Sequence, residues 1–256
     1  MGWSRSYLQK VRVQTLGIHK YRKQSAPFYM EEEEHEAKKR YRKMMTEMFT
    51  PGTNNLIVVD DEHHIYLDQS NNVSYMYYNS TSRNVAPKEI KTHPQRKFCP
   101  KLMVWLAITM KRRSEPYIAP HKKNTDQKVY LKECLEKRLI PFLKMAYPKG
   151  NAIFWPDKAR AHYARTVQTF LREQKIKCVE YNLNPMKVPQ TRSVETYWAE
   201  LDRRLSLYRK PAKDLQILKQ RIRETIKRIP ESYLQSVMAG VRTKLRKIAD
   251  WGSQAA

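Results

Sequence analysis

The stretch "LIVVDDEHHIYL", residues 56–67, decides the fold that we expect for this chain. Its apolar residues alternate with polar ones, which is typical of a β-strand with one buried face. Asp61 falls on the same face as Ile57 and Val59, whereas Asp60 points to the opposite face. This parity favours Asp61 as the carboxylate that faces the interior. The alternative is that both aspartates simply end a strand.

The rest of the chain predicts an α/β domain around this strand. Further strands are predicted at residues 74–81, 101–110, 152–156 and 176–181. Helices are predicted at residues 3–16, 30–49, 126–143, 160–174 and 194–207. Two closing helices carry apolar stripes over residues 215–229 and 233–248. Strands in succession, followed by alternating helices and strands, indicate a mixed sheet covered by helices.

The composition favours a polyanionic partner. The 256 residues include 50 Lys and Arg against 25 Asp and Glu, a formal charge of +25, so nucleic acid is the first candidate. Three cysteines in no metal-finger or disulfide spacing indicate reduced thiols. Residues 1–10 show no apolar signal segment, and the longest apolar run is too short to span a bilayer. We therefore expect a soluble, intracellular protein.

Two further acids occur in settings that resemble that of Asp61. In "AIFWPDKARAHYA", residues 152–164, Asp157 follows an apolar strand, either as a helix cap or as part of a metal-binding cluster. In "RSVETYWAELDRRL", residues 192–205, Ser193 is the expected N-cap. Glu195 precedes the buried Trp198 by three residues and is expected on the same helix side. Alone, Glu195 would be an ordinary helix-start glutamate; Glu200, farther along the helix, is expected to face solvent.

Taken together, the three acids point to metal chemistry. Two strand-end aspartates and one helix-borne glutamate would repel one another unless cations neutralised them, and a buried lone carboxylate is costly. Hard divalent cations prefer such oxygen ligands, and a pair of Mg²⁺ ions can drive phosphodiester displacement. Basic residues that hold a nucleic-acid backbone and acids that hold metals suit an enzyme that acts on DNA or RNA.

The ordered motifs resemble those of DDE transposases of the mariner superfamily over roughly residues 55–250. They are "VVDDEHHIYL", "KLMVWLAI", "FWPDKARAHYA", "VPQTRSVETYWAEL" and the tail "RIPESYLQSVMAGVRTKLRKIADWG". The family's Asp-Glu pair corresponds to Asp61 and Glu62. Its Asp-Asn-Ala-Arg-Pro-His motif corresponds to Asp157, Ala159, Arg160 and His162. Its Pro-Ile-Glu-x-x-Trp motif corresponds to Glu195 and Trp198. Thirty-seven residues separate the second and third acids, a spacing used by one branch of the superfamily.

The resemblance implies a ribonuclease H-like catalytic domain, with a mixed sheet flanked by helices. Asp61, Asp157 and Glu195 would be both the catalytic residues and the ligands of two Mg²⁺ or Mn²⁺ ions. The implied reaction is cut-and-paste DNA transposition, in which transposon ends are cleaved and their 3′-hydroxyls attack target DNA at TA dinucleotides. The implied partners are terminal inverted repeats and a second copy of the chain, and the implied compartment is the nucleus.

The N-terminal stretch "WSRSYLQKVRVQTLGIHKYRKQSAPFY" resembles the end of the family's paired helix-turn-helix region. We therefore predict a remnant of that domain and its linker at residues 1–26, a connecting helix at 27–52 and the catalytic domain at 53–256. We expect a truncated element product. The DNA-binding residues implied by the resemblance are Arg5, Lys10, Arg12, Lys20, Arg22, Lys23, Arg160 and His162.

Departures from the family pattern leave other functions open. Lys158 replaces the family's Asn and is expected to add a positive charge at the metal site, and Leu106 replaces a Gly. One alternative is a catalytically inactive, transposase-derived DNA-binding protein. Another is a generic ribonuclease H-like nuclease, which fits the three acids but not the helix-turn-helix remnant.

Overall fold

A mixed β-sheet forms the centre of the molecule. The computed structural model describes residues 4–16, 30–67, 99–121, 126–185, 191–208 and 210–252. Within these ranges, five strands pair in the order β3-β2-β1-β4-β5. β2 is antiparallel to β1 and β3, whereas β4 is parallel to β1 and β5. The strands are β1 (Ile57–Tyr66), β2 (Lys101–Thr109), β3 (Tyr117–Ile118), β4 (Ile153–Trp155) and β5 (Lys177–Cys178).

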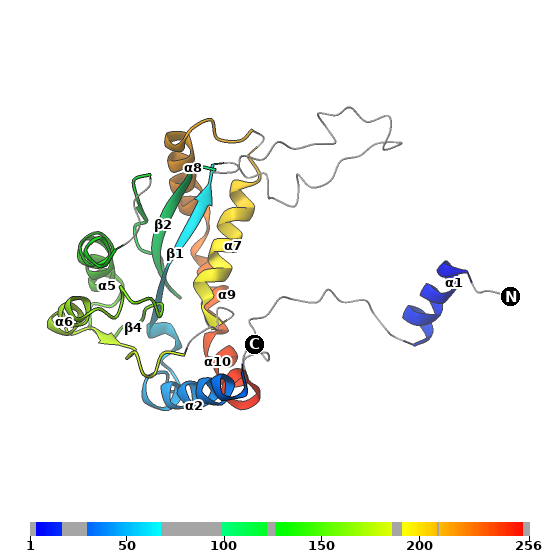
Figure 1. Ribbon diagram of the computed structural model, residues 1–256, viewed down its shortest axis with the longest axis horizontal. Helices are drawn as coiled ribbons and strands as arrows, with labels where there is room; N and C mark the ends of the chain where they lie inside the picture. The colour runs from blue at the N-terminus through cyan, green and yellow to red at the C-terminus, as the bar shows by residue number, and fades with distance from the viewer. Residues whose placement is uncertain are drawn as a thin grey trace.

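Helices cover both faces of this sheet (Figure 1). One face packs against α4 (Gln127–Val129), η4 (Tyr130–Leu139), α5 (Ile140–Ala146) and α6 (Arg165–Glu173). The other packs against α2 (Glu31–Glu47), α7 (Ser193–Leu205), α8 (Leu215–Arg228), α9 (Glu231–Ala239) and α10 (Val241–Trp251). The remaining helical segments are α1 (Arg5–Lys10), η1 (Val11–Thr15) and η2 (Asn54–Leu56). The predicted helix-covered mixed sheet is therefore confirmed.

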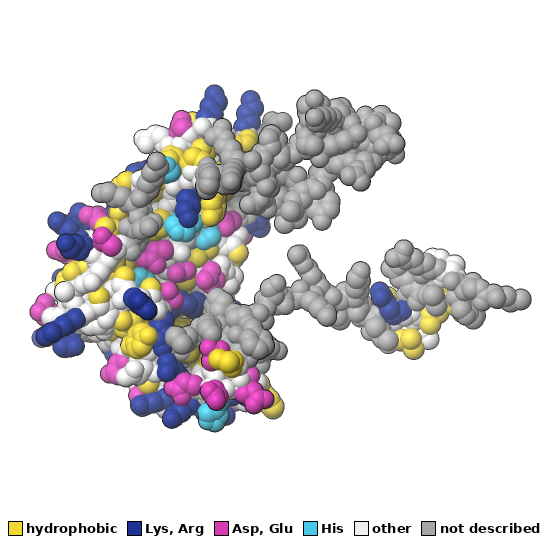
Figure 2. Space-filling view, viewed as in Figure 1, with side chains coloured by type: hydrophobic (Ala, Val, Ile, Leu, Met, Phe, Trp, Pro, Cys, Tyr) yellow, Lys and Arg dark blue, Asp and Glu magenta, His cyan; other side chains and the backbone are white. Residues whose placement is uncertain are grey.

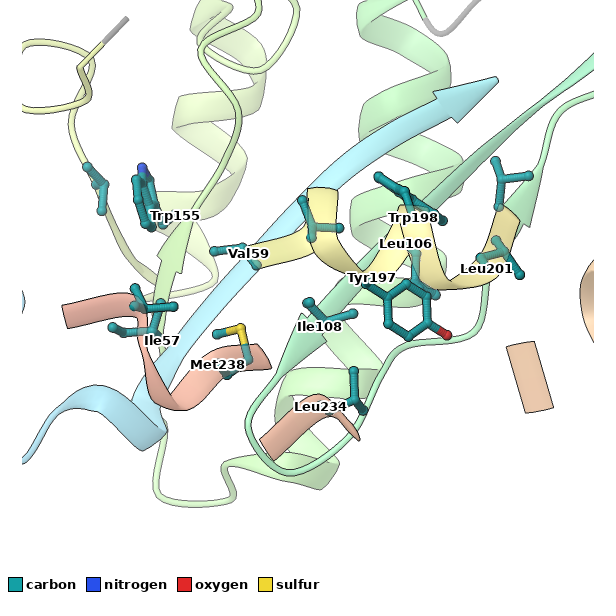
Figure 3. Packing of buried hydrophobic residues seen from close by; sticks show 14 of the residues in the cluster. Ile57, Val59, Leu106, Ile108, Trp155, Tyr197, Trp198, Leu201, Leu234 and Met238 are labelled. Atoms are coloured by element: carbon teal, nitrogen blue, oxygen red, sulfur yellow. The ribbon is translucent and has the colours of Figure 1, made fainter. Parts of the chain in front are cut away.

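Alternation along β1 separates two hydrophobic cores. Ile57, Val59 and Trp198 of α7 belong to one core (Figure 3). Val58 belongs to the other core. β2 is buried along almost its whole length because helices lie on both of its faces. Parity therefore assigned the faces of β1 correctly: Asp61 is on the α7 side, and Asp60 is on the opposite side.

Helix α2 is part of the same packed body. Its predicted stripe of Ala37, Tyr41, Met44 and Met48 is buried. α2 lies beside α10 (Figure 1), and the Nε of Arg42 donates a hydrogen bond of 3.0 Å to the carbonyl oxygen of Ala249. The proposed division of the chain into domains stays a prediction. No helix in the described part of the chain is long and apolar enough to cross a membrane.

The structure corrects several predicted elements. The helix predicted from residue 160 begins only at Arg165, because the segment before it forms turns held by tertiary contacts. The last predicted helix is divided at Gly240 into α9 and α10, at a residue type that weakens helices. The helix predicted at 126–143 forms but is π-helical in its middle. The predicted strand at 74–81 lies outside the described residues, and the two-residue β3 was not predicted.

Candidate acidic site

Strand register brings Asp61 and Asp157 to neighbouring positions. β1 and β4 run parallel, and Val59 pairs with Trp155. Asp61 and Asp157 each follow that pair by two residues, so both lie beyond the carboxyl end of the paired segment. The alternative that Asp60 and Asp61 simply end a strand is wrong, because β1 continues to Tyr66 through its pairing with β2.

Asp61 faces helix α7. The indole Nε1 of Trp198 donates a hydrogen bond of 3.2 Å to Oδ2 of Asp61. Trp198 is itself buried and stacks on the ring of His63, with centroids 5.2 Å apart. The carboxylate is therefore held against the one helix that also carries Glu195.

Glu195 lies at the edge of the α7 stripe rather than within it. Its side chain is exposed, which contradicts the predicted burial on the side of Trp198. Three residues rotate a helix by about 300°, so the two side chains diverge by about 60°. The predicted N-cap is also wrong: Ser193 is the first helical residue, and its hydroxyl donates to the carbonyl of Val237 at 3.1 Å.

Burial and neighbouring acids raise the pKa of Asp61 to about 7. Burial is the largest cause. The guanidinium of Arg192 opposes it, and the negative charges of Glu195, Asp157 and Glu62 add to it. The negative charges of both other predicted site acids, Glu195 and Asp157, therefore act on Asp61. Acidic side chains gather near the middle of the face shown in Figure 2, with Lys and Arg around them.

The donor chemistry fits a hard divalent cation, because three carboxylates offer oxygen ligands and a cation would relieve their repulsion. The side chains are not gathered into a finished coordination shell. Among the described residues, no group of three or more His, Cys, Asp or Glu side chains is arranged so that it could hold a metal ion. A bound cation would require the carboxylates to come closer together.

The opposite face of β1 carries a second buried carboxylate, that of Asp60. Its Oδ2 accepts hydrogen bonds from Nε1 of Trp105 at 2.9 Å and from the hydroxyl of Tyr130 at 2.7 Å. Burial raises the pKa of Asp60, and the nearby charge of His162 opposes this. Sequence reasoning missed the role of Tyr130, because its partner lies 70 residues away in the chain.

His162 connects β1 to the turn that carries Asp157. Its Nε2 lies 3.1 Å from Oε1 of Glu62, and its Nδ1 lies 3.1 Å from the carbonyl oxygen of Asp157. The ring is 1% exposed and stacks on Tyr130 with centroids 3.9 Å apart. Burial lowers its pKa, but the hydrogen bond to Glu62 and nearby acids outweigh this and raise it to about 9. The imidazolium can donate to both partners.

The surroundings of His162 differ from those expected. Neither His162 nor Arg160 lies on a helix, as the prediction of a helix at 160–174 would require, because residues 160–164 form turns and a bend. His162 is buried, whereas Arg160 is exposed. Their roles toward DNA stay predictions.

Arg192 joins the two strands just before their aspartates. Its Nη1 donates to the carbonyl oxygen of Pro156 at 3.1 Å, and its Nη2 donates to the carbonyl oxygen of Asp60. The side chain is 8% exposed and lies 5.4 Å from the ring centre of Trp155. Sequence reasoning did not single it out. The sequence signal that could have done so is its place three residues before Glu195, directly before α7.

Lys158 does not point its charge at the acids. Its Nζ donates to the carbonyl oxygen of Asn184 and lies 4.3 Å from the ring centre of Tyr181. Burial, together with the charge of Arg40, lowers its pKa to about 8. The expectation that Lys158 adds a positive charge at the metal site is therefore not met, because its ammonium group binds the carbonyl of Asn184 instead.

Charged residues on the outer side of α7 pair with one another. The prediction that Glu200 faces solvent is wrong, because its side chain is only 11% exposed. It accepts 2.6 Å hydrogen bonds from both Arg203 and Arg204. These bonds lower its pKa to about 2. Oδ2 of Asp202 lies 2.9 Å from Nε2 of His63, and this pair joins α7 to β1.

The predicted N-terminal DNA contacts are only partly within the described residues. Lys10 is exposed and Arg12 is half-buried. Arg5 and Lys10 are the first and last residues of α1, and Arg12 lies in η1. The remaining three, Lys20, Arg22 and Lys23, lie outside the described residues.

The sheet order, with helices on both faces, defines a ribonuclease H-like α/β fold. The Mos1 mariner paired end complex with Mn matches with a TM-score of 0.76 over 98% of this chain and 71% of that chain, at 14% identity. The catalytic domain of Mos1 mariner transposase matches with a TM-score of 0.67 over 90% and 98%, at 12% identity.

A comparison of sequences also finds similarity to a transposase. The Tc3 transposase of Caenorhabditis elegans is 26% identical over 147 residues, which are 57% of this chain and 43% of that protein. No protein family model matches the chain. The chain is thus similar to mariner-superfamily transposases, as its motifs indicate, and its match spans less than half of the Tc3 protein.

Proposed function

We propose that this chain carries the catalytic domain of a DNA transposase that cleaves transposon ends and joins them to target DNA. One observation carries the proposal: strand register brings Asp61 and Asp157 side by side, within the field of Glu195. A chain with a formal charge of +25 suits a DNA substrate. The similarity to Tc3 transposase supports the same class of activity.

The three carboxylates would hold two Mg²⁺ or Mn²⁺ ions. When bound, such ions supply an activated oxygen nucleophile and stabilise the leaving oxygen in phosphodiester displacement. Mos1 transposase has been solved with Mn and with Mg, which supports divalent cations as the cofactor. In this chain, Trp198 would orient Asp61, and His162 would hold the turn of Asp157 through its backbone carbonyl.

The substrate and assembly are also part of the proposal. The substrates would be terminal inverted repeats and TA target sites, bound by a homodimer in the nucleus. Solved Mos1 structures include a paired-end complex and a strand transfer complex, which supports an assembly of this kind. Arg5, Lys10, Arg12 and Arg160, with Lys20, Arg22 and Lys23, would contact the DNA backbone.

A plasmid-nicking assay tests the catalytic part. Supercoiled DNA is incubated with the purified chain and Mg²⁺ or Mn²⁺, and nicked product is quantified for wild type, Asp157→Asn and Glu136→Gln. Glu136 is an exposed acid on η4 and serves as the control. We expect metal-dependent nicking in wild type and Glu136→Gln only. Nicking that survives in Asp157→Asn would refute the assignment of this acid.

A second function is favoured by one observation. In the described residues, the acids are not arranged so that they could hold a metal ion. This arrangement suits a transposase-derived protein that binds DNA without cleaving it. Binding of labelled duplex DNA by wild type, without nicking in either cation, would support this second function.

A further inference from the structure

The β1–β4 ladder ends just before the acidic site. The last backbone pair is Val59 with Trp155, and the residue that follows β4 is Pro156, which has no backbone N–H to donate. From this point the two backbones need another connection to stay at a fixed separation. Asp61 and Asp157 both lie on the unpaired side of this point.

Arg192 supplies that connection. Its guanidinium donates to the carbonyl oxygens of Asp60 and Pro156, the residues that immediately precede the two aspartates. A planar guanidinium presents its donors in a rigid fork, so two acceptors bound to it are held at a set distance. Arg192 also lies three residues before Glu195, so one side chain contacts or adjoins all three acid-bearing segments.

The guanidinium is fixed by its own surroundings. It packs near the ring of Trp155, whose Nε1 donates to Oδ1 of Asn184 at 2.9 Å. Nδ2 of Asn184 donates to the carbonyl of Pro156 at 2.9 Å, beside the bond from Arg192. A buried arginine with this many partners has little room to change its position.

We propose that Arg192 is a positioning residue that sets the separation of Asp61 and Asp157 and thereby the affinity of the acidic site for divalent cations. This inference rests on the metal-dependent function proposed above. Arg192 also carries a positive charge, which repels a bound cation. Loss of positioning would weaken cation binding, whereas loss of the positive charge would strengthen it, so substitutions can separate the two effects.

Cation titration of the full chain tests the proposal. Tb³⁺ serves as the probe, because its luminescence is sensitised by a nearby indole and Trp198 contacts Asp61. The variants are Arg192→Lys, which keeps the charge but loses the fork, and Arg192→Met, which loses both. Arg113→Met is the matched control, because Arg113 also bridges two carbonyls, those of Ile229 and Lys227, at 2.8 and 3.1 Å.

Positioning predicts that both Arg192 variants raise the Tb³⁺ concentration for half-saturation by about 10- to 100-fold, as loss of a ligand-orienting contact typically does. Arg113→Met should leave it within about twofold of wild type, since neither carbonyl that Arg113 binds adjoins one of the three acids. Unchanged affinity in Arg192→Lys, or tighter binding in Arg192→Met, would overturn the proposal. Arg192→Lys decides the question if Arg192→Met does not fold. No Tb³⁺ binding by wild type would instead refute the metal-dependent function.

Discussion

Replacing Asp61 by Asn should stabilise the metal-free protein at alkaline pH. The pKa of Asp61 is about 7 instead of its ordinary 3.8, because the folded chain buries this carboxyl among other acids. Folded protein therefore keeps a proton that unfolded protein releases, and stability falls as the pH rises from about 4 to 7. A difference of about three in pKa corresponds to as much as about 4 kcal/mol above pH 7. Asn carries no charge and can still accept the bond from Trp198.

Urea unfolding at a series of pH values, with a chelator present, measures this effect. The stability gain of Asp61→Asn over wild type should be small near pH 4 and should grow to its full size at pH 8. Asp250→Asn is the control, because Asp250 is an exposed acid on α10, and it should show no such pH trend. A loss of stability in Asp61→Asn of the same size at every pH would refute the reasoning, because it would mean that Arg192 keeps the carboxylate ionised and favourable.

Three other substitutions have defined outcomes. His162→Gln should remove up to about 3 kcal/mol of stability at pH 6 and much less at pH 9.5. The pKa of His162 is raised from its ordinary value of 6.5 to about 9, so its protonation stabilises the fold fully below pH 6.5, and this stabilisation is lost as the pH rises through 9. Urea midpoints at the two pH values measure the effect. Trp198→Phe removes the N–H donor to Asp61 while it keeps an aromatic ring in the core, so it should cost about 1 kcal/mol more at pH 8 than at pH 4, and an equal cost at both would contradict this. Glu200→Gln breaks its pairs with Arg203 and Arg204 and should lower stability by about 1 kcal/mol in low salt, with a smaller loss in high salt that thermal unfolding can follow.

The sheet and two of its acids could be predicted because their signals are local. Alternation in residues 56–67 identifies both faces of β1, since each face packs in a different core. The apolar run before Pro156 identifies β4, and the acid that follows a buried strand in a parallel pair falls at the sheet's carboxyl edge. Apolar spacing likewise located α7 and most of its buried residues.

The contacts that shape the site could not be predicted, because they join residues far apart in the chain. Arg192 reaches Asp60 across 132 residues, and His162 reaches Glu62 across 100. The Ala-rich segment after Asp157 favours a helix by local propensity, but the buried ring of His162 holds it as turns instead. Whether Glu195 faced the core or its edge depended on about 60° of helix rotation, which a three-residue spacing does not resolve.

The unequal strand pairings have a consequence for how the acidic site comes apart on heating. β1 is bound to β2 along most of its length, whereas β4 is a three-residue strand. Short, sparsely bonded segments open locally at lower free energy than the protein as a whole. Local opening around β4 would carry Asp157 away from Asp61 while the β1–β2 ribbon stayed folded. Separation of the two aspartates on heating should therefore begin below the temperature of global unfolding, and amide exchange at residues 153–164 should outpace that of β1.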